Sequence, residues 1–340
     1  MKITTVGLDL AKSVFQVHGV GAGQAILRRR LKRPQVLCFF AQLPPCLIGM
    51  EACGGAHYWA RKLAEQGHTV RLISPQFVKP FVKSNKNDMA DAEAICEAVQ
   101  RPNMRFVPVK STDQQAVLAV HRAREGFVGA RVAIGNQIRG LLAEFGLVLP
   151  KGKANLARVP ALLSESGVPA TLQHLIEGLL AHYRQLETRT TELEQQLQAW
   201  HRSNEASQRL VTIPGVGVIS ATAMVATVGD ARQFRNSRQM AAWLGLVPRQ
   251  HSTGGKPTLL GISKRGDGYL RRLLIHGGRA VLRKAPTRPN AGTLWHVRVM
   301  RRRNKNIAAV ALANKNARII WALLARQATY DPFHRAAEAA

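Results

Sequence analysis

The hydrophobic pattern of the first third of the chain alternates between strand-like and helix-like periods. Short β-rich runs separated by polar turns predict strands, and apolar residues spaced three and four apart predict helices. The predicted strands are Ile3–Leu10, Ser13–Val20, Leu47–Met50 and Thr69–Ile73, and the predicted helices are Tyr58–Glu65 and Asp88–Val99. This order of elements favours an α/β sheet domain that ends near residue 110.

From Asp113 to about Trp200 the pattern becomes helical, and its second half carries a heptad repeat. The a and d positions are Leu172, Ile176, Leu179, Tyr183, Leu186, Thr190, Leu193, Leu197 and Trp200. Such a series is typical of a coiled coil, and we expect it to join subunits. A long helix packed on its own domain is the alternative.

The last third begins with the run IPGVGVISA and continues into a region rich in Arg and Lys, from Arg249 to Lys305. We divide the chain into a sheet domain (1–112), a helical linker with the coiled coil (113–205), a mainly helical basic domain (206–328) and a tail (329–340).

Charge narrows the choice of partner. The chain has 49 Lys and Arg against 20 Asp and Glu, a net charge of +29. A field of this strength favours nucleic acid, whose phosphates release counterions on binding. An anionic membrane is the competing interpretation, but no run of 18 apolar residues is present. The four cysteines form no CxxC pair, and the N-terminus reads as a strand, so we expect a cytoplasmic protein that works at the nucleoid.

Acidic residues are scarce, yet four of them stand at structured positions. Asp9 lies in the first strand, Glu51 follows the apolar run LIGM, and Asp88 and Asp91 lie three apart on one helix face. Carboxylates brought together repel unless a cation holds them, and Mg²⁺ prefers oxygen ligands. Two such ions can clamp the two reacting oxygens of a phosphodiester. Taken singly, each residue has a simpler explanation, such as a turn or, for Asp88, a helix N-cap.

Longer motifs carry a resemblance to a known family. They are VGLDLAKSVFQVHGV, IGMEACGGAHYWARKL, LISPQFVKPFVKSNKNDMADAEAI, IPGVGVISATA, WLGLVPRQHSTGGK and LLGISKRGDGYLRRLLIHGGRA. In this order, from about Lys2 to about Ala328, the chain resembles the Piv/MooV-type DEDD transposases of insertion sequences. That family is numbered one-hundred-ten, and the subgroup is numbered eleven-eleven.

The resemblance implies a RuvC-like domain with an RNase H fold, in which Asp9, Glu51, Asp88 and Asp91 bind Mg²⁺ or Mn²⁺. It also implies a C-terminal transposase domain with a serine nucleophile in PRQHSTGGK. Ser252 and Thr253 both fit, and we favour Ser252 because its primary hydroxyl is less hindered. Both could instead only shape a turn. The family further implies a dimer or tetramer that joins the two domains of different subunits, and a guiding non-coding RNA.

Glycine and basic motifs complete the predicted interface. The run IPGVG resembles the hairpin of a helix–hairpin–helix motif, in which Gly215 and Gly217 would let the backbone contact phosphate. A plain turn between two helices is the alternative interpretation. The other predicted nucleic-acid contacts are Lys12, Lys83, Lys86, Lys256, Lys264, Arg265, Arg271, Arg272, Arg301, Arg302 and Arg303. A solvated basic face is the alternative.

The combined expectation is a DNA transposase that cleaves and rejoins element ends and target DNA. Two other functions stay open. One is a Holliday-junction-type nuclease that uses the carboxylates alone, and the other is a nucleic-acid-binding protein without catalysis.

Overall fold

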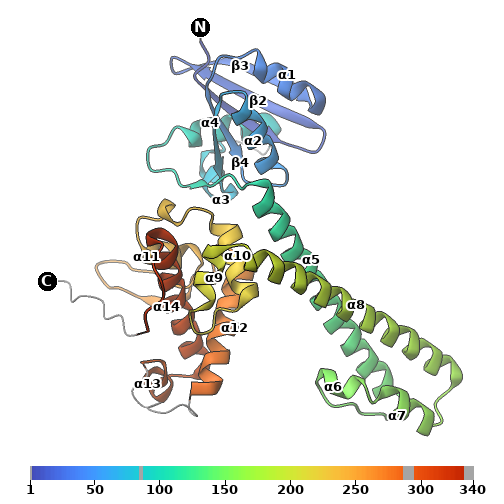
Figure 1. Ribbon diagram of the computed structural model, residues 1–340. Coiled ribbons are helices and arrows are strands. Elements are labelled where there is room, and N and C mark those ends of the chain that lie inside the picture. Colours follow the sequence, from blue (N-terminus) through green and yellow to red (C-terminus); the bar gives the residue numbers. More distant parts are fainter. Residues whose placement is uncertain (1, 84–86, 286–294, 333–340) are drawn as a thin grey trace. The chain divides into compact units, whose positions relative to one another are not determined.

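The computed structural model of the chain describes residues 2–83, 87–285 and 295–332. They form two compact units, Met1–Thr112 and Asp113–Ala340 (Figure 1). The finer division at residues 205 and 328 stays a prediction.

The N-terminal unit is built on a six-stranded mixed sheet of order β3-β2-β1-β4-β5-β6. Its strands are β1 (Thr5–Leu10), β2 (Val14–Gly21), β3 (Gln24–Lys32), β4 (Leu47–Glu51), β5 (Thr69–Ile73) and β6 (Phe106–Val107). The first three strands form an antiparallel meander, β1, β4 and β5 run parallel, and β6 is antiparallel to β5. The predicted α/β class is thereby confirmed.

Helices cover both faces of this sheet. They are α1 (Val36–Ala41), α2 (Ala56–Glu65), the short α3 (Pro75–Val78) and α4 (Asp88–Val99), with 3-10 turns at Arg33–Gln35 and Lys79–Phe81. Val6 and Leu8 of β1 share one buried cluster with Trp59 and Leu63 of α2. Helix α4 packs on the opposite face. This alternation follows from the two-residue period of a strand.

Two paired glycines let α4 approach the sheet closely. Gly7 of β1 lies beside Gly49 of β4 in the register. A Cβ atom on Gly7 would lie 2.0 Å from the carbonyl oxygen of Ala92, and one on Gly49 would lie 2.8 Å from Cβ of Val99. Only glycine fits at these positions, and the backbone of α4 therefore rests directly on β1.

Strands β3 and β6 have no counterpart in the sequence prediction. The sequence of β3, QAILRRRLK, lacks a clean alternation because both of its faces are largely exposed at the edge of the sheet. Strand β6 is only two residues long. The other predicted strands and helices of this unit are confirmed to within a few residues.

The C-terminal unit is mostly helical, as expected. Its helices are α5 (Thr112–Ala143), α6 (Lys153–Leu156), α7 (Val159–Glu165), α8 (Ala170–Arg202), α9 (Glu205–Val211), α10 (Val218–Val228), α11 (Ser237–Trp243), α12 (Gly268–Lys284), α13 (Trp295–Arg302) and α14 (Lys305–Arg326), with a 3-10 turn at Ala231–Gln233. The two short strands β7 (Pro248–Gln250) and β8 (Leu259–Ile262) form a hairpin. A core formed mainly by α9 to α12 and α14 holds the unit together.

The heptad face of α8 packs inside the chain. Helix α5 runs antiparallel beside it, as the pairs Trp200–Asp113, Glu194–Arg124 and Tyr183–Gly135 show. Most of the heptad residues are buried there, and Leu172 and Ile176 share a cluster with residues of α5 to α7. The alternative interpretation, a long helix packed on its own domain, accounts for this pattern. An intermolecular coiled coil is not shown.

Helix α14 has the length and composition of a membrane-crossing helix, but it is a core helix of this unit. Ala313, Ala317 and Ile320 are fully buried in the core that α14 shares with α11 and α12. Among the described residues it is the only helix that is long and apolar enough to cross a membrane.

A buried histidine joins the α5–α8 pair to this core. His121 of α5 is 1% exposed, and its ring lies 3.0 Å from both Tyr269 Oη and Thr222 Oγ1. The Thr222 hydroxyl donates to the carbonyl of Val218, so it accepts from Nε2–H, and Tyr269 donates to Nδ1. With a neutral ring, both ring nitrogens and both hydroxyl groups have a hydrogen-bond partner. Burial, with a contribution from nearby Arg124, lowers the pKa of His121 to about 4.

We predict that Gly7→Ala destabilises the N-terminal unit by about 1–3 kcal/mol, because the added methyl group displaces α4. Gly54→Ala is the matched control, since a Cβ there meets no atom within 4 Å. Denaturant unfolding measures both. Equal effects of the two substitutions would contradict the close packing.

We also predict that the protein loses stability as the pH falls from about 6.5 to about 4. In this window the unfolded chain binds a proton at His121 and the folded chain does not, so the contribution is complete above pH 6.5. The loss between pH 7 and pH 5 is about 2 kcal/mol by the linkage relation. Urea unfolding at the two pH values should show the full loss in the wild type and in His174→Gln, an exposed control on α8, and a loss smaller by this amount in His121→Gln. Burial also lowers the pKa of His18 and of His201, so a residual loss is expected in all three proteins.

Candidate active site

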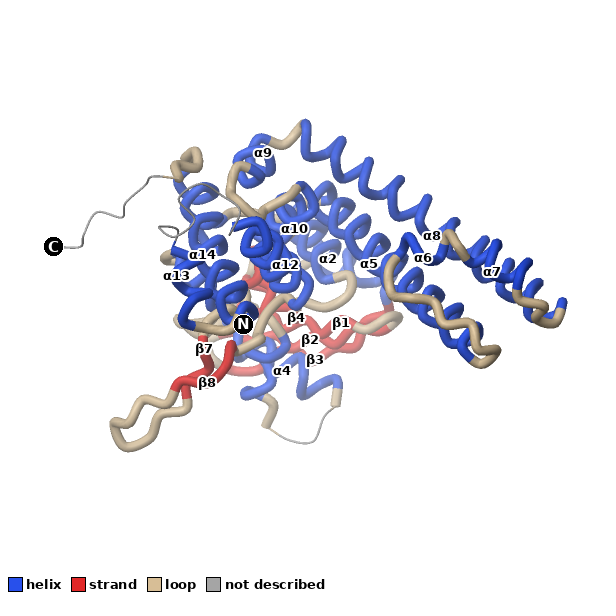
Figure 2. The backbone as a smooth tube through the Cα atoms, turned by 90° about the horizontal axis from the view of Figure 1, so that it is seen from below, coloured by secondary structure: helices blue, strands red, loops and turns tan. Residues whose placement is uncertain are grey.

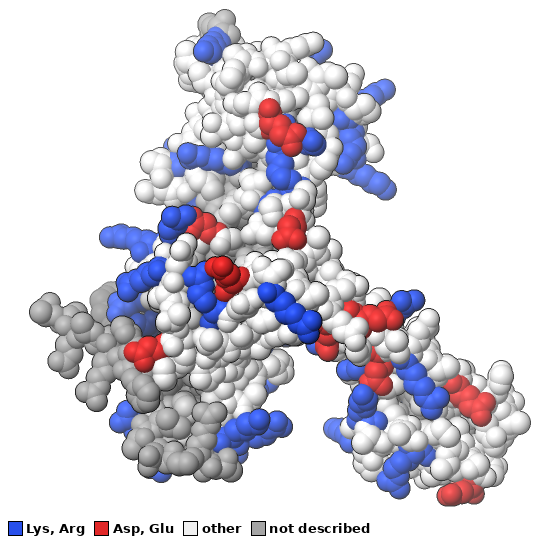
Figure 3. All heavy atoms as spheres, viewed as in Figure 1, with Lys and Arg blue, Asp and Glu red and all other residues white. Residues whose placement is uncertain are grey.

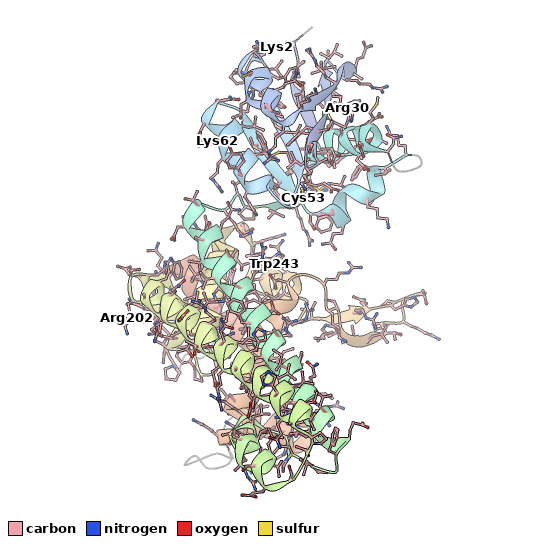
Figure 4. All side chains as sticks on the ribbon, turned by 90° about the vertical axis from the view of Figure 1, so that its right-hand side faces the viewer. Lys2, Arg30, Cys53, Lys62, Arg202 and Trp243 are labelled. Carbon is pink, nitrogen blue, oxygen red and sulfur yellow. The ribbon has the colours of Figure 1, made fainter. Side chains whose placement is uncertain are left out.

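The first two predicted carboxylates lie at the ends of neighbouring strands. The register of β1 and β4 pairs Leu8 with Met50, and Asp9 and Glu51 are the next residues of each strand. Because side chains alternate, both share the face of Gly7 and Gly49, which α4 covers. Partial burial raises the pKa of the Cys53 thiol, and the negative charges of Glu51 and Asp9 raise it further. Figure 4 shows Lys2 and Cys53 at opposite ends of this unit.

The other two carboxylates extend the sheet-facing side of α4. The carbonyl of Ala92 lies over Gly7, and Cys96 lies nearer to the start of β1, with its Sγ 3.9 Å from the carbonyl oxygen of Thr5. Helix α4 therefore runs opposite to β1, and its N-terminus points toward the strand end that carries Asp9. Asp88 and Asp91 stand in the first turn of α4.

Asp88 is not the N-cap of α4, which corrects one simpler explanation of this residue. Asn87 is the N-cap, and its side-chain oxygen accepts a hydrogen bond of 2.7 Å from the amide of Ala90. Asp88 is exposed and Asp91 is half-buried. The Asp88 carboxylate is thus left outside the cap.

The chemistry of these four donors fits a hard divalent cation, since all are carboxylates from β1, β4 and α4 on one face of the sheet. Within the described ranges, however, no three His, Cys, Asp or Glu side chains stand close enough to hold an ion together. The structure therefore brings the four carboxylates to the same end of one sheet face and does not assemble a closed metal site.

The serine candidate lies on the hairpin of β7 and β8, which Figure 2 shows extending away from the helices of its unit. Ser252 Oγ accepts a hydrogen bond of 2.9 Å from the Gln250 side chain and one of 3.3 Å from the Thr258 amide. Such donors would stabilise negative charge on the oxygen. Thr253 pairs with Lys256 across the tip of the hairpin, which turns at Gly254 and Gly255, two glycines in the left-handed region.

The loop before α10 has one open glycine and one packed glycine. A Cβ on Gly215 would lie 2.8 Å from the carbonyl oxygen of Gly277 in α12, so close packing explains this residue. Gly217 is exposed at the N-cap of α10, and a Cβ there would meet no described atom within 4 Å. Phosphate contact by Gly217 stays a prediction.

The predicted basic contacts separate into engaged and exposed residues. Lys83 pairs with Glu93 and Glu97, Arg272 pairs with Glu125, and Arg271 donates to the carbonyls of Leu244 and Arg265. Those that are exposed and form no ion pair with another described residue are Lys12, Lys256, Lys264, Arg265, Arg301, Arg302 and Arg303. Lys86 lies outside the described residues. Figure 3 shows Lys and Arg spread over the face that it draws.

Sequence reasoning missed the residues that hold the candidate serine. Gln250 and Thr258 lie on opposite sides of the hairpin, and only the fold brings them to Ser252. A polar residue two positions before the serine was the one available signal.

Comparison with known proteins covers both units. Residues 207–292 match the family model described as "Transposase IS116/IS110/IS902 family", and residues 6–146 match one described as "Transposase", named for the DEDD transposases of IS110. A "Probable family 20 transposase" of Pseudomonas aeruginosa is 56% identical over 98% of this chain and 100% of its own.

Two further relatives are named for their insertion sequences. The "Transposase for insertion sequence element IS1111A" of Coxiella burnetii is 47% identical over 96% of this chain and 91% of its own. The "Transposase for insertion sequence element IS1328" of Yersinia enterocolitica is 45% identical over 94% and 96%. These matches span nearly the whole chain, which therefore belongs to the IS116/IS110/IS902 family of transposases.

Proposed function

We propose that this chain cleaves and rejoins DNA at the ends of an insertion sequence and at its target, through carboxylate-bound Mg²⁺ or Mn²⁺ and the hydroxyl of Ser252. The observation that carries the proposal is the convergence of Asp9, Glu51, Asp88 and Asp91 on one end of one sheet face. The order of strands, with an antiparallel meander followed by parallel strands, supports a RuvC-like RNase H fold for this unit.

In the proposed reaction, Ser252 Oγ attacks phosphorus. A bond forms between Oγ and phosphorus, the bond from phosphorus to a sugar oxygen breaks, and the Oγ proton passes through solvent to the leaving sugar oxygen, which departs as a hydroxyl. Gln250 and the Thr258 amide donate to Oγ and would stabilise its negative charge as the proton departs. The phosphoserine link conserves the energy of the broken bond for rejoining. Bound divalent ions would polarise the phosphate and stabilise the leaving oxygen.

The remaining partners follow from the family and from the charge of the chain. A net charge of +29 suits duplex DNA and a guiding non-coding RNA together. Assembly into a dimer or tetramer would let the carboxylates of one subunit act with the serine of another. The nucleoid is the expected place of action.

Asp9→Asn should reduce cleavage of element-end DNA by at least about a hundredfold in Mg²⁺, because it replaces an anionic carboxylate at the end of β1 with a neutral amide. Glu65→Gln, an exposed carboxylate of α2 paired with Lys62, is the matched control and should cleave like the wild type. The assay measures nicked product from labelled DNA with the cognate RNA. Full cleavage by Asp9→Asn would contradict a metal-binding role of this carboxylate, and no cleavage by the wild type would favour a nucleic-acid-binding protein without catalysis.

A suicide substrate should trap a covalent protein–DNA adduct in the wild type and in Thr253→Ala, but not in Ser252→Ala. Denaturing gels detect the adduct and mass spectrometry locates it. Loss of the adduct in Thr253→Ala alone would identify Thr253, and not Ser252, as the nucleophile. Cleavage without adduct that survives both substitutions would leave the Holliday-junction-type hydrolysis, which needs no serine.

A further inference from the structure

Helix α13 separates its residues sharply into two faces. Trp295, Arg298, Arg301 and Arg302 are spaced at i, i+3, i+6 and i+7, so they share one side of the helix. They line one open hollow in the surface of the C-terminal unit.

The opposite face of α13 fixes the helix to its unit. Val297 is buried, and Val299 and Met300 pack on a cluster formed by Leu282 of α12 and by α14. The hollow therefore stands on a helix that is anchored by apolar packing. Its lining cannot turn inward without exposing those residues.

The arginines of the hollow are not neutralised by acidic side chains of the described chain. The sequence has no Asp or Glu between Asp267 and Asp331. Among the residues that the structure describes, Arg298, Arg301 and Arg302 form no ion pair, and all three are exposed. Other cations of the chain, such as Lys83, form ion pairs with glutamates. The three arginines of the hollow are therefore available to bind an anionic partner.

An aromatic ring lies at the same place. Trp295 is 37% exposed, although tryptophan is usually well buried. Lys315 of α14 lies 5.2 Å from the centre of the ring, and adds a further cation beside it. Duplex backbone needs only cations, whereas an exposed aromatic ring among arginines is typical of sites that stack unpaired bases.

We propose that this hollow binds an unpaired nucleotide, with its base stacked on Trp295 and the flanking phosphates on Arg298, Arg301 and Arg302. The ligand is a single-stranded segment of nucleic acid, which either the guiding RNA or an opened DNA strand could supply. The choice of ligand rests on the proposed function, but binding in the hollow requires neither the carboxylates nor Ser252.

The test is a titration of the full-length protein with fluorescein-labelled eight-nucleotide single strands of RNA and of DNA, and with the matching duplex, followed by anisotropy. Trp295→Ala should weaken single-strand binding about tenfold, within the range of base–aromatic stacking, and leave duplex binding within about twofold. Trp295→Phe should restore most of the affinity. Arg298→Gln should lower the salt dependence of binding by about one counterion.

Tyr58→Ala is the matched control, because Tyr58 is an aromatic residue of α2 with 43% exposure and lies in the other unit. It should leave single-strand binding unchanged. Photo-crosslinking with 5-iodouracil in the RNA and in the DNA should attach to the peptide of Trp295, and the stronger arm identifies the source of the strand.

Three results would overturn the proposal: unchanged single-strand binding in Trp295→Ala, equal loss for single strand and duplex, or cross-links that all map elsewhere. These assays involve no strand cleavage. A failure of the serine mechanism would therefore leave them unaffected, and a failure here would leave the adduct assay unaffected.

Discussion

The contact of α4 with the paired glycines of β1 and β4 is the constraint on which the candidate site depends. Because Gly7 and Gly49 carry no side chain, the helix backbone reaches the sheet surface. The first turn of α4 is thereby directed toward the strand ends that carry Asp9 and Glu51. A larger residue at either glycine would lift the helix and separate Asp88 and Asp91 from the other two carboxylates. The spacing of the acidic residues is thus controlled by a packing contact that contains no charge.

The two parts of the proposed chemistry are stabilised in different ways. The carboxylates depend on contacts between elements far apart in the sequence, whereas Ser252 is held by two donors from its own hairpin. A hairpin with local hydrogen bonds can keep its geometry while it moves as a body. A nucleophile that must reach a phosphate on a separate macromolecule would benefit from this arrangement, and the carboxylates proposed to bind metal would benefit from a rigid sheet.

The sequence predicted the parts of the fold whose periodicity burial imposes. Strands β1, β4 and β5 are buried on both faces or at their ends, so their sequences contain apolar runs that predicted strands. Strand β3 was not, because arginines such as Arg30 occupy an edge where no burial selects an alternating pattern. The heptads of α8 correctly predicted a long packed helix, but periodicity cannot tell whether the packing partner belongs to the same chain. Helix α5 supplies the partner here. The pairing of Gly7 with Gly49, the Asn87 cap and the donors to Ser252 needed the register and the turns of the fold.

The last part of the C-terminal unit carries positive charge that its own acidic side chains do not neutralise. A protein that needed its cations only for solubility would gain from ion pairs on its own surface, as the α5–α8 pair does with Arg124 and Glu194. Between Asp267 and Asp331 the sequence has no other acidic residue, and the cations there repel one another in the free protein. Such repulsion costs stability, and the buried side chains of α14 offset it within the core. A bound phosphate backbone would remove this repulsion. In the proposed complex the same charges that weaken the free unit would strengthen binding, so its affinity for nucleic acid and its own stability would be linked by one set of side chains.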